Sequence, residues 1–275
     1  MKSQQLRKLA GGTIVATAMS LASIAGAQAA VTPFTWDPQA VVGIGGTFSG
    51  DNITTKDYAT VQVTDPATGA FTETGILKLD AFSLAGANSG TPGLNTTYAL
   101  YATFNATGSI PGGVAPGVGQ TFGGTFNTFT FSLNVAPQSG GPITYNATAA
   151  GATLTGIGAS TTVANGSLLS GTASISNTAL AGLSAGANVL TTFNYVDPAF
   201  FIAPPSSLGL QLFSSIINTG SVLSLANNNT ELVINGGGGN STLQTSPAVP
   251  EPASLALLAS GLIGLGLIRR RKLVA

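Results

Sequence analysis

The 275-residue chain contains no histidine and no cysteine, and charged side chains make up only 7% of it. Without these residue types it has no Ser-His or Cys-His nucleophile pair, and no imidazole or thiolate ligand for a metal. No disulfide can form, so stability must come from burial and hydrogen bonding. Since only carboxylates remain for catalysis, we expect a protein that is not an enzyme and uses no cofactor.

Basic residues are also scarce between residues 30 and 248. Seven of the nine lie near the chain ends, at Lys2, Arg7, Lys8 and 269–272. The stretch between them keeps two lysines against eight carboxylates, a net charge of −6. It has no arginine, which excludes an arginine clamp for phosphate, and its acidity excludes a basic surface for nucleic acid.

Residues 1–29 have the pattern of a secretory signal peptide. The three basic residues near the start precede an uncharged apolar run, and Ala27-Gln28-Ala29 provides a small-residue cleavage site. We predict recognition by the general secretion machinery, cleavage by signal peptidase after Ala29, and export of the chain that follows. An uncleaved N-terminal anchor is the alternative.

The C-terminal segment, residues 249–275, has three unlike parts in a fixed order. The first is stiff and extended because its two prolines restrict the backbone: Val249, Pro250, Glu251, Pro252, Ala253 and Ser254. Residues 253–268 are uncharged and rich in Leu and Ala, which predicts a short membrane helix. The third part is the basic cluster Arg269, Arg270, Arg271 and Lys272. Such a cluster stays on the cytoplasmic side and places the preceding chain across the membrane.

This order of motif, apolar helix and basic end resembles the PEP-CTERM sorting domain. The resemblance implies sorting by an exosortase, a membrane-embedded cysteine transpeptidase of Gram-negative bacteria that make exopolysaccharide. The helix would span about 24 Å, short of a hydrocarbon core of about 30 Å, which favours transient anchoring in the inner membrane. After processing, the protein would lie at the cell surface or in the extracellular matrix. An ordinary single-pass anchor with a chance Pro-Glu-Pro is the alternative.

The body, residues 30–235, alternates apolar and polar residues in several runs, as strands with one buried face do. In residues 125–135, Phe129, Phe131 and Leu133 share one face and threonines the other. Many short strands separated by turns predict an all-β fold, an antiparallel β-sandwich-like body. The glycines that follow and the polar residues to 248 predict a flexible linker over residues 236–248.

Acidic residues are the main candidates for chemistry in the body. Asp51, Asp57 and Asp65 lie near predicted turns, but their spacing lacks a calcium-loop pattern, so we predict no metal site. A calcium site assembled from distant loops stays open. Glu73 paired with Glu231, or with an aspartate, is the carboxylate arrangement that would suit a glycosidase.

The single tryptophan is the other candidate. Trp36 would suit stacking on a sugar ring, although a lone tryptophan beside the first strand more often fills the edge of the core. We favour the core position.

Scattered blocks of the body resemble flocculation-associated PEP-CTERM proteins of the PepA type. They are Phe34–Pro38, Thr47–Tyr58, Thr97–Phe104 and Gly236–Asn240. The resemblance implies a role in holding cells together through the extracellular polymer matrix. We therefore expect a non-enzymatic exported protein of exopolysaccharide-associated flocs or biofilm. It would act through many weak polar contacts and self-association along sheet edges. A carbohydrate-binding module for the exopolysaccharide and an exported polysaccharide hydrolase are the alternatives.

Overall fold

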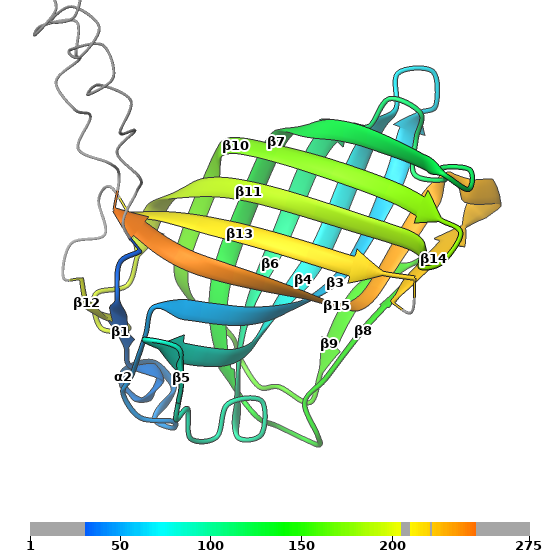
Figure 1. Ribbon diagram of the computed structural model, residues 1–275. Helices are drawn as coiled ribbons and strands as arrows, with labels where there is room; N and C mark the ends of the chain where they lie inside the picture. Colours follow the sequence, from blue (N-terminus) through cyan, green and yellow to red (C-terminus); the bar gives the residue numbers. More distant parts are fainter. Residues whose placement is uncertain (1–30, 205–209, 221, 246–275) are drawn as a thin grey trace, which may run out of the picture. The chain divides into compact units, whose positions relative to one another are not determined.

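The computed structural model describes residues 31–204, 210–220 and 222–245, which belong to one compact unit (Figure 1). The predicted signal peptide and the sorting segment 249–275 lie outside these residues. Within them, no helix is both long and apolar enough to cross a membrane.

Eight long strands follow one another around a single antiparallel sheet (Figure 1). In chain order they are β3 (Asn52–Asp65), β4 (Ala70–Leu84), β6 (Tyr98–Ser109), β7 (Gln120–Pro137), β10 (Thr161–Thr178), β11 (Gly182–Val196), β13 (Leu210–Thr219) and β15 (Glu231–Thr245). The last strand, β15, pairs with both β13 and β3, so the sheet closes on itself.

Closure corrects two expectations. The all-β, antiparallel prediction is confirmed, but one closed sheet replaces the expected sandwich of two, because the last strand pairs back onto the first long one. Closure also removes the long free edges that self-association would need. Among the described residues, only short strands such as β14 (Leu223–Ala226) and β5 (Ala87–Ser89) lie at the margin of this sheet.

The alternating pattern determines which side chains fill the interior. In β7, Phe129, Phe131, Leu133 and Val135 are buried, whereas Thr130 between the first two is exposed, as predicted. The same alternation on neighbouring strands creates one continuous apolar core inside the closed sheet.

The predicted linker is wrong for residues 236–245, because they form the second half of β15. Gly237 lies opposite Asp57 of β3, and a Cβ built on Gly237 would lie 1.1 Å from Oδ1 of Asn218 on β13. The glycine therefore leaves room for a neighbouring side chain. Pairing on both sides holds this run in place, although its composition resembles that of a flexible linker.

Aromatic residues cover one end of the closed sheet. They come from β1 (Phe34–Trp36), β2 (Phe48–Gly50) and β12 (Phe201–Ala203), which form a small sheet beside the helix α2 (Pro38–Val42). Trp36 is only 1% exposed, and its ring centroid lies 5.3 Å from that of Phe200. This position confirms the core role for the tryptophan.

A hairpin of β8 (Thr144–Thr148) and β9 (Gly151–Thr155) packs on the outer side of the sheet, against β3, β4 and β15. It covers a second, smaller apolar cluster that includes Ile76, Tyr101 and Leu154. A short 3-10 helix, η1 (Asn227–Asn229), connects β14 to β15.

Candidate functional site

The closed sheet encloses a cavity of about 100 Å³ with two unlike walls. One wall is aromatic and comes from β4, β6, β7 and β11: Phe71, Phe104, Phe126, Phe129, Phe131 and Phe193. The other wall is polar and comes mainly from β3, β13 and β15: Thr55, Asp57, Ser214, Asn218 and Ser241, with Glu73 of β4 and Thr191 of β11. An eight-stranded closed sheet has an interior just wide enough for side chains or one small ligand.

Asp57 is the centre of the polar lining. It is 3% exposed, and Asn218 donates from Nδ2 to its Oδ2 at 3.4 Å. This contact joins strands β3 and β13 across β15, and it forms only because Gly237 between them has no side chain. Asp57 Oδ1, Asn218 Oδ1 and Thr55 Oγ1 are buried without a hydrogen-bond partner.

Glu73 supplies the second interior carboxyl group and is 8% exposed. Burial raises its pKa to about 8, and the negative charge of Asp57 contributes to that rise. Burial likewise raises the pKa of Asp57 to about 7, against a smaller lowering by the Asn218 hydrogen bond. Taking a carboxylate out of water disfavours its charged form, so both groups hold their protons to a higher pH than usual.

The outer side of β4, β6, β7 and β10 carries a different surface. Cross-strand pairing places its hydroxyl and amide side chains in rows, for example Thr74 opposite Asn105, Asn105 opposite Thr130, and Thr130 opposite Ser167. We call this surface the hydroxyl-amide face; its members are Thr72, Thr74, Thr103, Asn105, Thr107, Thr128, Thr130, Ser132, Asn165 and Ser167. All ten are exposed or half-buried, and none is charged.

Tyr195 lies at the margin of this face. It is opposite Asn165 in the β10–β11 pairing and is 47% exposed. Its outward position was not predicted from the sequence. A bulge at Asn194 places Tyr195 on the outer side, and simple alternation from Phe193 would have placed it inside.

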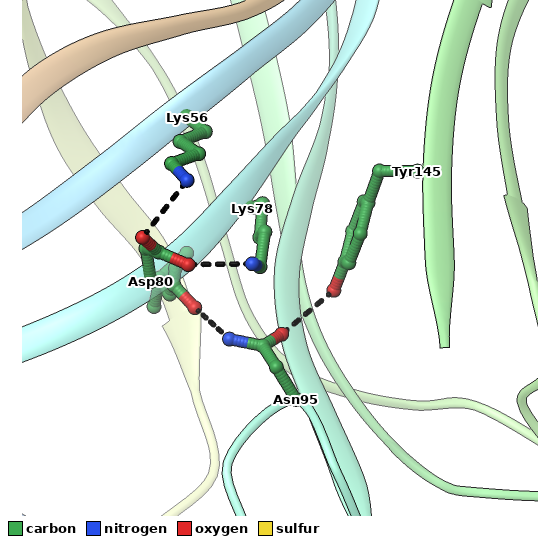
Figure 2. Close-up of polar contacts among 6 residues, drawn as sticks. Lys56, Lys78, Asp80, Asn95 and Tyr145 are labelled. Carbon is green, nitrogen blue, oxygen red and sulfur yellow. Dashed lines mark hydrogen bonds and ion pairs between the residues drawn. The ribbon is translucent and has the colours of Figure 1, made fainter. Parts of the chain in front are cut away.

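Neither lysine of the body lines the cavity. Figure 2 shows that both pair with Asp80. Lys56 and Lys78 pair with Asp80 at 3.4 and 2.5 Å. Burial tends to raise the pKa of Asp80, but the hydrogen bonds and charges of the lysines outweigh it and lower that pKa. Asn95 links this cluster to the outer hairpin, because it donates to the Leu79 carbonyl and accepts from Tyr145 Oη at 3.2 Å.

The structure separates most of the predicted site residues. Glu73 lines the cavity, whereas Glu231 is on the opposite side of the sheet and accepts a hydrogen bond from Asn227, so the proposed pair does not meet. Glu73 does share the interior with Asp57, the aspartate partner that the sequence analysis allowed. A cavity of about 100 Å³ nevertheless leaves no room for a polysaccharide chain between them.

The three aspartates considered for calcium serve separate purposes. Asp51 accepts from the backbone N of Ala85, and Asp65 accepts from Ala67 N and Thr68 Oγ1 in the β3–β4 turn. Asp57 is inside the sheet. In the described part of the chain, no group of three or more acidic side chains is arranged to hold a metal ion.

Comparison with known proteins finds a match only in the C-terminal segment. Residues 248–272 match the family model of the PEP-CTERM protein-sorting motif. No curated protein and no solved structure matches the chain. The motif indicates an exported protein that an exosortase sorts, with processing at the membrane.

Proposed function

We propose that this exported, exosortase-sorted protein is a non-enzymatic component of the exopolysaccharide matrix that supports floc or biofilm formation. It contacts the polysaccharide through the hydroxyl-amide face. The observation that carries the proposal is the composition of that face: ten hydroxyl and amide side chains on four adjacent strands, with no charge among them.

Such a face suits a neutral, hydroxyl-rich polymer. Neighbouring strands lie about 4.7–4.9 Å apart, and this spacing is close to the length of one sugar unit along an extended chain. Each hydrogen bond contributes only about 0.5–1.5 kcal/mol, because it replaces bonds to water. Affinity would therefore come from many contacts made along one polymer, through effective concentration rather than through one strong site.

Binding to purified exopolysaccharide tests the proposal. We expect the triple variant Thr74→Val, Thr128→Val, Thr130→Val to bind severalfold more weakly, because it removes three hydroxyls from the face and keeps side-chain size. The matched control is Thr144→Val, Thr153→Val, Thr155→Val, which removes three exposed hydroxyls from the β8–β9 hairpin. Equal binding by the two variants would contradict the role of the face.

The cellular role needs a separate measurement. Cells that lack the protein but keep their exopolysaccharide should settle more slowly than the parent. Normal settling with intact polysaccharide would remove floc formation from the proposal.

Tyr195 supports a second candidate, a discrete carbohydrate-binding module. An exposed aromatic ring beside Asn165 and Asn194 offers a sugar ring a stacking surface together with amide hydrogen bonds. Under this candidate, binding of exopolysaccharide fragments is saturable and is lost in Tyr195→Ala. Under the distributed-contact proposal, the same substitution weakens binding only slightly.

Processing by the exosortase is tested on the secreted protein. Mass spectrometry of the form found in culture fluid should show a C-terminus near Pro250. An intact C-terminus at Ala275 would favour a simple membrane anchor.

A further inference from the structure

The cavity inside the closed sheet is unusual in the polar atoms that it leaves unpaired. Asp57, Asn218 and Thr55 are each only 3% exposed, and each has a buried oxygen without a hydrogen-bond partner. Buried polar groups are normally paired, because an unmade hydrogen bond costs about 1–3 kcal/mol. Two of the three oxygens, Asp57 Oδ1 and Asn218 Oδ1, are acceptors, so the site calls for a donor.

The charge of the lining points in the same direction. Asp57 and Glu73 are the titratable groups among the described residues that line the cavity, and no lysine or arginine lies with them. The two lysines of the body are engaged with Asp80 on the outer side. A positively charged donor would compensate both carboxyl groups.

The remainder of the lining is apolar. Phe104 lies over Gly75, where a Cβ would come within 2.6 Å of its ring, and Phe104 stacks on Phe129 with centroids 5.3 Å apart. Both rings line the cavity and would contact hydrocarbon. The cavity, of about 100 Å³, is smaller than an apolar protein cavity of roughly 150 Å³ that holds benzene, so it suits a ligand of about four or five non-hydrogen atoms.

We infer that the cavity is a binding site for a small aliphatic primary amine. Its ammonium group donates to Asp57 Oδ1 and Asn218 Oδ1, and its short hydrocarbon part lies against Phe104 and Phe129. The part of the cavity lining that comes from β10 and β11 includes the small residues Ala173, Ser174, Ala185, Gly186 and Ala187, and Ser174 is exposed.

The test compares n-butylamine with 1-butanol, which has the same number of non-hydrogen atoms but no charge. At pH 8.5 the amine is protonated, and Asp57, with its pKa of about 7, is ionised. We expect calorimetric titration of the full protein to show the amine binding about tenfold or more tightly than the alcohol, as a charge-assisted hydrogen bond predicts. The amine should also raise the melting temperature in proportion to its occupancy.

Variants locate the site. Asp57→Asn keeps the side-chain shape and should remove the preference for the amine, whereas Asp51→Asn, an outer carboxylate bonded to Ala85, should leave it unchanged. A second measurement does not depend on any variant folding: the affinity of the wild-type protein for the amine should fall severalfold from pH 8.5 to pH 5.5, as Asp57 and Glu73 take up protons. Equal binding of amine and alcohol, no binding of either, or a preference that survives Asp57→Asn would overturn the inference.

Discussion

Gly237→Ala is the substitution that most directly tests how the interior is built. A Cβ at this position would lie 1.1 Å from Asn218 Oδ1 and 2.2 Å from its Cγ. Asn218 therefore has to move, and its hydrogen bond to the buried Asp57 carboxyl is lost. The substitution therefore breaks the hydrogen bond between Asn218 and Asp57 although residue 237 takes no part in that bond.

The expected cost follows from these contacts. Overpacking in a well-packed interior costs about 1–3 kcal/mol, and an unpaired buried polar group costs a similar amount. We expect Gly237→Ala to lower the free energy of unfolding by about 2 kcal/mol. For a unit of this size that corresponds to a melting temperature lower by about 4–8 °C.

A double-mutant cycle separates this clash from any general effect of alanine. In an Asn218→Ala background the obstructing side chain is gone, so Gly237→Ala should cost less than about 0.5 kcal/mol. Gly238→Ala is the matched control, because a Cβ there meets no atom within 4 Å and the backbone φ is not positive. Circular dichroism during urea unfolding measures the wild-type protein and the four variants. A Gly237→Ala effect no larger than that of Gly238→Ala, or one that persists in the Asn218→Ala background, would refute the reasoning.

Two further predictions concern stability. Burial raises the pKa of Asp57 to about 7 and that of Glu73 to about 8, so between about pH 5 and pH 7 the folded protein holds protons that the unfolded chain has released. The free energy of unfolding should therefore fall as pH rises through this window, by at most about 1.4 kcal/mol per pH unit for each carboxyl. Urea titrations at several pH values measure this, and a slope that is equally steep in Asp57→Asn, Glu73→Gln would contradict the assignment. Trp36→Ala should cost about 3–5 kcal/mol in the same assay, since its side chain is buried among aromatic rings, whereas the exposed Tyr195→Ala should change stability by about 0.5 kcal/mol or less. Similar losses for both would show that Trp36 does not hold the aromatic end together.

Local patterns in the sequence were sufficient for several conclusions. The PEP-CTERM motif is a short contiguous segment, so residues 248–272 could be identified without any fold. Alternation of apolar and polar residues has a period of two in any strand, which predicted the strand around Phe129 and Phe131 and the all-β class. The core position of Trp36 followed from its place beside the first strand.

The glycine-rich composition of residues 236–239 led to a wrong linker prediction, because pairing with neighbouring strands holds a segment that would be flexible by itself. Four consecutive glycines are typical of a linker, yet they lie within β15, where Gly238 and Gly239 pair with strands on both sides, and the missing side chain of Gly237 admits Asn218 to the interior. A bulge in β11 likewise turns Tyr195 outward. Neither effect has a local signature, because each depends on which strand lies alongside.

Composition and local patterns are enough to establish that the protein carries an exosortase sorting motif, that its body is acidic and rich in strands, and that it lacks histidine and cysteine chemistry. Two features appear only in the folded chain: the strands close into one sheet, and Asp57 meets Asn218, 161 residues further along the chain, beside an apolar cavity. Closure depends on pairing between the first and last long strands, which are far apart in the sequence. That pairing decides which carboxyl groups lose contact with water, and no pattern within a single strand records it.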